Sequence, residues 1–259
     1  GGYSGIGKTE LVNELHKPII KENGIFLSGK CDQYNKNTPY SALFNALDQF
    51  CTYILSDSEV EVKNWGEKIV DSLGKNGALL IDVIPRLQLI IGSQPQLMEE
   101  SIVEVQVKFS AALQNLLRAI SSQNRPIVFF IDDLQWIDSA SLELFEKVIF
   151  DNSIRGLMFI CTYRENEVDA SHPLIRTIEK IKKDRGKIEY LHLDNLNIYA
   201  VTEMIFNIFS CNKEDAYGLA KIVHEKTLGN PFYIIEFLKY CNEEKLLYYN
   251  VCEKRWKWN

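Results

Sequence analysis

Short, mostly apolar runs occur in the chain at residues 25–29, 127–131 and 157–161. The run at 127–131 is apolar at every position, which favours the central strand of a parallel sheet, because helices then cover both of its faces. Apolar residues at helical spacing lie between the second and third runs. This order of strand, helix and strand predicts an α/β architecture with a parallel sheet.

Helical spacing of apolar residues also predicts the helices that flank the sheet. One helix follows Thr9 and is expected to stop at Pro18. Another is expected to start at Thr38-Pro39, with the hydroxyl as N-cap and the proline at the first helical position. Residues 56–100 alternate short helical patterns with glycine and proline, which predicts a helical insertion, and the amphipathic pattern over 109–120 predicts one more helix.

The pattern changes to helices alone from Asn197 onward. We therefore expect an α/β domain over residues 1–190 and a small all-α lid domain over 191–245, with 246–259 as the start of a following region. The first residue is Gly1 rather than Met, so we expect the natural start and the first strand of the sheet to precede it.

Composition excludes several classes of protein. Of 259 residues, 46% are hydrophobic and 25% are charged, which is ordinary for a globular chain. The net charge of -6 provides no positive field to gather nucleic acid or an anionic membrane, and no apolar run approaches the roughly 20 residues that cross a bilayer. The six cysteines occur singly, away from any metal-ligand spacing. We expect a cytoplasmic protein with buried, reduced thiols.

Residues Gly2 to Thr9 fit the phosphate-loop pattern G-x-x-x-x-G-K-[ST] at every fixed position. Glycines let the backbone curl so that several N–H groups point into one cavity, and the helix that follows adds its positive dipole end. Lys8 is expected to reach the β- and γ-phosphates, and the Thr9 hydroxyl to ligate Mg²⁺. The nucleotide-binding residues expected in this loop are Gly2, Ser4, Gly5, Ile6, Gly7, Lys8 and Thr9.

The apolar run at 127–131 ends in Asp132-Asp133, the pattern of a Walker B strand. Asp132 is expected to hold Mg²⁺, usually through water, and Asp133 to orient or deprotonate an attacking water. In isolation the pair could equally be a strand-end turn in which an aspartate caps a helix. The phosphate loop upstream favours the metal and catalytic interpretation.

Two further residues have a functional and a structural interpretation. Arg164 follows the third strand, where ligands of parallel sheets bind, and could form a charge-assisted hydrogen bond with a γ-phosphate or a surface ion pair with Glu165 or Glu167. Residues 228–232 could form a glycine cap followed by a helix that starts at proline. Alternatively, this turn lies over adenine and Pro231 offers the base its flat apolar surface.

Several segments of the chain, taken in their order, resemble the origin-recognition-complex-like AAA ATPase domains of the STAND class. The resemblance covers essentially the whole chain and is closest to the domain found in multi-sensor signalling proteins, between a serine/threonine-kinase-like domain and sensor plus histidine-kinase modules. The matching segments are the phosphate loop, Pro39-Tyr40, Ile84-Pro85, Gln94-Pro95, residues 132–138, residues 163–168, His172-Pro173-Leu174 and residues 229–232.

The resemblance implies a P-loop NTPase sheet followed by a helical lid, with ATP or ADP and Mg²⁺ as cofactors. It assigns phosphate and Mg²⁺ binding to Lys8 and Thr9, the metal carboxylate to Asp132, its acidic neighbour to Asp133, the sensor to Arg164 and the adenine contact to Pro231. Such proteins resemble switches in which ADP holds a closed form and ATP opens it, often with oligomerisation. Asp133 stands where vigorous hydrolases carry glutamate, which implies slow turnover.

The leading hypothesis is thus an ATP-dependent signalling switch in which Lys8, Asp133 and Arg164 act on the nucleotide and the helical domain closes through Pro231. Its expected partners are flanking kinase-like and sensor domains of the same polypeptide, and a second copy in an ATP-driven homo-oligomer. One alternative is a scaffold that holds ADP without hydrolysis. Another is a DNA-binding AAA initiator, against which the acidic balance counts.

Overall fold

The computed structural model of the chain describes residues 1–34, 38–95, 101–122, 124–184 and 186–258. These residues divide into two compact units. One unit, the sheet unit, is Leu11–Tyr190, and the other, the helical unit, combines Gly1–Glu10 with Leu191–Asn259. The phosphate-loop sequence therefore folds with the C-terminal part of the chain.

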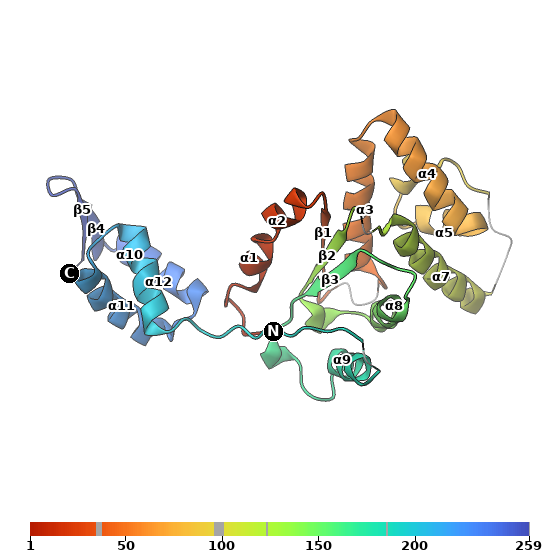
Figure 1. The fold of residues 1–259 in the computed structure, drawn as a ribbon. Helices are drawn as coiled ribbons and strands as arrows, with labels where there is room; N and C mark the ends of the chain where they lie inside the picture. The colour runs from red at the N-terminus through yellow and green to blue at the C-terminus, as the bar shows by residue number, and fades with distance from the viewer. Residues whose placement is uncertain (35–37, 96–100, 123, 185, 259) are drawn as a thin grey trace. The chain divides into compact units, whose positions relative to one another are not determined.

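The described residues of the sheet unit form three parallel strands, β1 (Ile25–Lys30), β2 (Ile127–Asp132) and β3 (Leu157–Cys161), in the order β1-β2-β3 (Figure 1). Strand β2 is central and its first five residues are all buried, so the prediction from its continuous apolar pattern is confirmed. Lys30 pairs with Asp132 in the register of β1 and β2. Because the strands are parallel, their carboxyl ends share one edge of the sheet.

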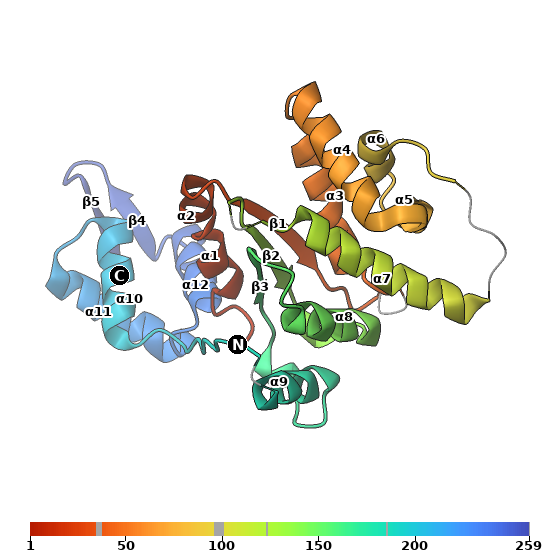
Figure 2. The same ribbon diagram turned by 45° about the vertical axis from the view of Figure 1, so that its right-hand side comes forward.

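Helices cover both faces of this sheet (Figure 2). The face that carries Leu27 and Phe129 contributes to the largest core together with α3, α4 and α7, whereas Phe26 on the opposite face lies against His16 of α2, with ring centroids 3.9 Å apart. The helices are α1 (Lys8–Asn13), α2 (His16–Lys21), α3 (Ser41–Leu55), α4 (Glu59–Leu73), α5 (Gly77–Ile81), α6 (Leu87–Ile91), α7 (Ile102–Ile120), α8 (Ser139–Phe150) and α9 (Pro173–Lys183).

The predicted helical insertion is confirmed for residues 56–95, which contain α4, a 3-10 turn at Gly74–Asn76, α5 and α6. Residues 96–100, the last part of that prediction, lie outside the described residues. The helix predicted over 109–120 is also confirmed, and α7 starts earlier, at Ile102, with a capping box between Ser101 and Glu104.

Two predicted helix boundaries are wrong. The first helix ends at Asn13, and Pro18 lies in the first turn of a second helix, α2, where a missing N–H costs no helical hydrogen bond. Helix α3 begins at Ser41 rather than at Thr38-Pro39. Its cap residue Tyr40 has φ 63°, and its N–H donates to Asp138, 3.1 Å away, so a distant carboxylate supplies the partner expected from Thr38.

Residues 191–258 of the helical unit form three helices, α10 (Ile198–Phe209), α11 (Lys213–Thr227) and α12 (Pro231–Glu243). Each begins at an asparagine whose side chain caps the helix: Asn197, Asn212 and Asn230. An antiparallel hairpin of β4 (Leu247–Asn250) and β5 (Arg255–Trp258) follows.

The core of the helical unit is formed by its three helices and the hairpin. Val201, Ile205 and Ile234 are fully buried in it. Trp256 packs on Phe209 with ring centroids 5.3 Å apart, so the hairpin contributes to the same core. No helix in the described part of the chain is long and apolar enough to cross a membrane.

Candidate functional site

The predicted phosphate loop turns at glycines. Gly2, Gly5 and Gly7 have φ values of 149°, 75° and 91°, which L side chains rarely adopt. The ammonium of Lys8 lies inside this turn, where it donates to the carbonyls of Gly2 (2.9 Å) and Tyr3 (2.7 Å). Helix α1 starts at Lys8, so a helix follows the glycine turn as the phosphate-loop pattern predicts. The loop is therefore a tight curl with a positive charge at its centre, which fits a phosphate-bearing ligand.

The loop also contacts the start of α12. The Asn230 side-chain amide donates to the carbonyl of Ser4 at 2.9 Å, and the Phe232 N–H donates to the carbonyl of Gly5 at 3.1 Å. Between them, Pro231 occupies the first position of the helix. The local geometry matches the cap interpretation of this segment, because Gly229 has a φ of 79° just after α11. The contact of Pro231 with adenine stays a prediction.

Asp132 and Asp133 lie at the carboxyl end of β2. The carboxylate of Asp132, the last residue of the strand, accepts a hydrogen bond from the Thr162 hydroxyl. Asp133 follows in the left-handed conformation (φ 58°) and is only 6% exposed. It precedes a 3-10 turn at Leu134–Trp136, but its side chain makes no capping hydrogen bond. The helix-cap interpretation therefore fails for Asp133.

Within the part of the sheet unit that the structure describes, the buried carboxylate of Asp133 has three partners. The Gln135 amide donates to it at 2.9 Å, Lys30 Nζ lies 3.2 Å away, and Arg164 Nε lies 3.5 Å away. Two positive charges and one amide thus surround a carboxylate that is almost out of reach of water, as burial of a charge requires.

Arg164 lies between two carboxylates. It forms the ion pair with Glu167 that the structural interpretation predicted, at 2.7 Å, and it also faces Asp133. Its guanidinium stands over the Trp136 ring, 5.1 Å from the centroid. The hydrogen bond with Glu167 raises the pKa of Arg164 above its ordinary value, and the charge of Asp133 adds to this, so the side chain stays positive. Its contact with a γ-phosphate stays a prediction.

Sequence reasoning missed Lys30 and Gln135. Lys30 ends β1 opposite Asp132, so the rule that placed Arg164 at the carboxyl edge would also have found it. Gln135 is 4% exposed, and both ends of its side-chain amide form hydrogen bonds. Its nitrogen donates to Asp133, and its oxygen accepts from the backbone N–H of Arg164 at 3.2 Å. A cavity of about 570 Å³ opens beside Lys30 and is lined by Lys30, Cys31, Asp32, Gln33, Tyr34, Ser41, Asn45 and Trp136.

A family model described as the AAA ATPase domain matches residues 1–160. The chain belongs to the AAA ATPase domain family. It is an ATP-binding NTPase module, with a parallel sheet, flanking helices and a further helical region.

Two curated proteins match the whole of this AAA ATPase domain. Hybrid signal transduction histidine kinase G of Dictyostelium discoideum is 26% identical over 326 aligned positions, which cover 100% of this chain and 9% of that protein. Peroxide stress-activated histidine kinase mak3 of Schizosaccharomyces pombe is 20% identical over 304 positions, which cover 100% of this chain and 12% of that protein. The chain thus spans about a tenth of the length of these relatives. No solved structure matches it.

The predicted site residues of the AAA ATPase domain form two groups, one in each unit. Asp132, Asp133 and Arg164 lie together in the sheet unit. The helical unit holds Gly2, Ser4, Gly5, Ile6, Gly7, Lys8, Thr9 and Pro231.

The cysteines of the AAA ATPase domain are free thiols. Burial raises the pKa of Cys31 and Cys51 to about 12, so these thiols stay protonated and unreactive at neutral pH. The prediction that the cysteines are buried is confirmed for Cys31, Cys51 and Cys241, whereas Cys161 and Cys211 are half-buried and Cys252 is exposed.

Proposed function

We propose that this AAA ATPase domain is a Mg²⁺-ATP-dependent switch module of a signal-transduction protein. The observation that carries the proposal is the phosphate loop, in which three glycines with positive φ curl around the ammonium of Lys8. Both relatives are named as histidine kinases, which supports a place beside kinase and sensor modules. A cytoplasmic location and ATP-driven association of copies belong to the same proposal.

In this proposal the nucleotide's phosphates bind to N–H groups of the loop and to Lys8. Thr9 and Asp132 would hold Mg²⁺, which neutralises charge on the phosphates when it is bound. Among the described residues, no three His, Cys, Asp or Glu side chains gather in a group that could hold a metal ion. The remaining ligands of Mg²⁺ in this proposal are phosphate oxygens and water, as this ion commonly prefers.

Slow hydrolysis is proposed from the surroundings of Asp133. Its oxygens already interact with Lys30, Arg164 and Gln135, so few lone pairs are left to orient a water. The side chain is also shorter than that of glutamate. We further propose that Arg164 senses the γ-phosphate, that Pro231 contacts adenine, and that movement of the helical region reports which nucleotide is bound.

The proposal is tested by titrating the chain with a fluorescent ATP analogue in the presence of Mg²⁺. Lys8→Ala removes the charge from the loop and should weaken binding roughly 10- to 100-fold, as loss of a hydrogen bond to a charged group does. Lys21→Ala, at the end of α2, is the control and should bind like the wild type. Absence of saturable ATP and ADP binding, or no effect of Lys8→Ala, would refute the proposal.

A scaffold that holds ADP without hydrolysis is the second candidate, and the three partners of Asp133 favour it. Phosphate release separates the two. In a switch, the wild type releases phosphate slowly and Asp133→Asn abolishes the release. In a scaffold, neither protein releases phosphate above background although both bind ADP.

A further inference from the structure

One side chain joins the phosphate loop to α12. Asn230 is 7% exposed, and its amide nitrogen donates to the carbonyl of Ser4 at 2.9 Å. Its oxygen meanwhile accepts from the N–H of Phe232 at 3.1 Å, which is the capping bond of the helix. The same Phe232 N–H lies 3.1 Å from the carbonyl of Gly5. Two consecutive carbonyls of the loop are thus bonded to one helix end.

These bonds fix the direction of two N–H groups. In a planar trans peptide the C=O and the N–H point in opposite directions. The carbonyl of Ser4 shares its peptide with the N–H of Gly5, and the carbonyl of Gly5 shares its peptide with the N–H of Ile6. Since both carbonyls point at α12, both N–H groups point away from it. Gly5 would otherwise let these peptides rotate, because glycine adopts either sign of φ readily.

The close approach needs a glycine at this position. A Cβ added to Gly5 would lie 2.8 Å from Cβ of Phe232 and 2.9 Å from Oδ1 of Asn230. Gly5 therefore serves the curl of the loop and its contact with α12 at once.

We infer that Asn230 is a positioning residue, whose amide holds the Ser4 carbonyl against α12 beside the bond from the Phe232 N–H to the Gly5 carbonyl, so that the Gly5 and Ile6 N–H groups are directed to bind nucleotide phosphates. The inference rests on the proposed function for its ligand. Asn230 touches the loop rather than the phosphates, so it acts through the backbone that it orients.

The chain contains its own controls. Asn197 accepts from the N–H of Ala200 at 3.0 Å and Asn212 from the N–H of Asp215 at 2.8 Å, so these residues cap α10 and α11 as Asn230 caps α12. Of these three described caps, only Asn230 contacts the phosphate loop. Serine caps helices as well as asparagine does and adds no charge, but its shorter side chain loses the bond to Ser4.

The experiment therefore compares Asn230→Ser with Asn197→Ser and Asn212→Ser in the full chain. Thermal midpoints show whether each cap survives, and affinities are measured for ATP, ADP and inorganic pyrophosphate. We expect similar midpoints for the three variants. Asn230→Ser alone should bind all three ligands about tenfold more weakly, as expected for loss of about one hydrogen bond's free energy.

A second measurement needs no nucleotide. In the chain labelled with ¹⁵N-glycine, the Gly5 amide resonance should shift and broaden in Asn230→Ser and stay unchanged in the two controls. If Asn230→Ser lowers the thermal midpoint, Asn230→Asp replaces it, because aspartate keeps the cap and the shape of the side chain but cannot donate to the Ser4 carbonyl. The Gly5 amide resonance should then shift and broaden in Asn230→Asp.

The outcomes separate this inference from the proposed function. A wild-type chain that binds neither ATP nor ADP nor pyrophosphate overturns the proposed function. Wild-type binding with no change in Asn230→Ser, equal weakening in all three variants, or an unmoved Gly5 resonance overturns the inference alone.

Discussion

At the scale of single residues, the site depends on the charges and hydrogen bonds that compensate the buried carboxylate of Asp133. A carboxylate that is 6% exposed is costly unless charges or hydrogen bonds surround it. Lys30 is the least restrained of its partners, since 64% of the lysine side chain is exposed. Lys30 can therefore be removed with little effect on folding, which makes its influence on Asp133 measurable.

Lys30→Met is expected to raise steady-state phosphate release about threefold, which corresponds to less than ~1 kcal/mol of activation free energy. The reason is that Oδ2 of Asp133 loses its nearest cation and becomes available to accept a hydrogen bond from water. ATP affinity should not change, and stability should fall by about 1 kcal/mol, because Arg164 and Gln135 still compensate the buried carboxylate.

The control for this substitution is Lys63→Met on α4, which removes a surface pair with Glu67 at 3.9 Å. Slower phosphate release in Lys30→Met than in this control would contradict the prediction and would show that Lys30 assists the reaction.

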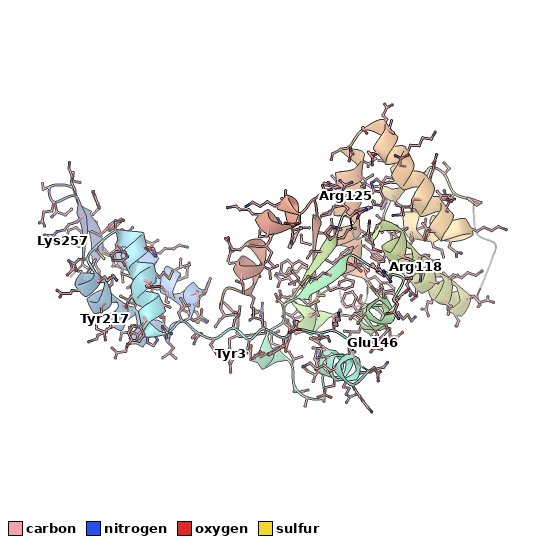
Figure 3. The ribbon with its side chains drawn as sticks, viewed as in Figure 1. Tyr3, Arg118, Arg125, Glu146, Tyr217 and Lys257 are labelled. Atoms are coloured by element: carbon pink, nitrogen blue, oxygen red, sulfur yellow. The ribbon has the colours of Figure 1, made fainter. Side chains whose placement is uncertain are left out.

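At the scale of elements, α7 is attached to the turn that leads into β3. Asp151, just after α8, accepts from Arg118 at 2.6 Å and from Gln114 at 2.9 Å, both on α7, and Arg118 is labelled in Figure 3. The Ser153 hydroxyl holds the same carboxylate within the turn. The hydrogen bond from the Ser153 hydroxyl has the largest effect on the pKa of Asp151. Together with the hydrogen bond from Arg118, it keeps this pKa well below its usual range.

Asp151→Asn is expected to cost about 2 kcal/mol of unfolding free energy at pH 7, the scale of a hydrogen bond to a charged group. The pKa of this carboxyl is lower in the folded than in the unfolded chain, so its stabilisation is complete above roughly pH 4 and is lost as the pH falls further. Urea unfolding at pH 7 and at pH 3 measures the difference, which should shrink at pH 3.

A matched control exists in Asp169, which forms the same kind of turn with Ser171 at an exposed position. Asp169→Asn should change stability little at either pH. An equal loss for Asp151→Asn at both pH values would exclude the charged network as its cause.

At the scale of the whole molecule, the chain contains separate cores. The core of the sheet unit includes Phe50, Ile69 and Phe129, and that of the helical unit includes Val201 and Ile205. Each set belongs to one compact unit. Stability should therefore be a property of each unit rather than of the chain as one body.

Ile205→Ala and Ile69→Ala test this division, because both isoleucines are fully buried in helices. Each substitution should destabilise its own unit by about 2–4 kcal/mol. Native-state hydrogen exchange, followed by mass spectrometry, should show faster exchange in α10 to α12 for Ile205→Ala and in β1 to β3 for Ile69→Ala. Equal acceleration in both units would contradict the prediction.

Much of the fold could be predicted because its signals are local. The apolar run of β2 identified a central strand, and the change of pattern at Asn197 identified a helical region. The candidate site was predicted less completely. Its glycine loop has a local signature, whereas the contacts of Lys30 with Asp133 and of Asn230 with Ser4 join residues that lie far apart along the chain, so local pattern could not reveal them.

The sequence by itself therefore determined the central strand, the helical regions and the turn of the phosphate loop, since periodicity and glycine conformations depend on neighbouring residues. The tertiary structure alone decided that Asp138 replaces Thr38 at the start of α3, that Lys30 and Arg164 share Asp133, and that Asn230 holds Ser4. These pairs lie far apart along the chain. The physical reason is that a buried polar group takes whichever partner folding brings within reach, and that choice depends on packing rather than on local pattern.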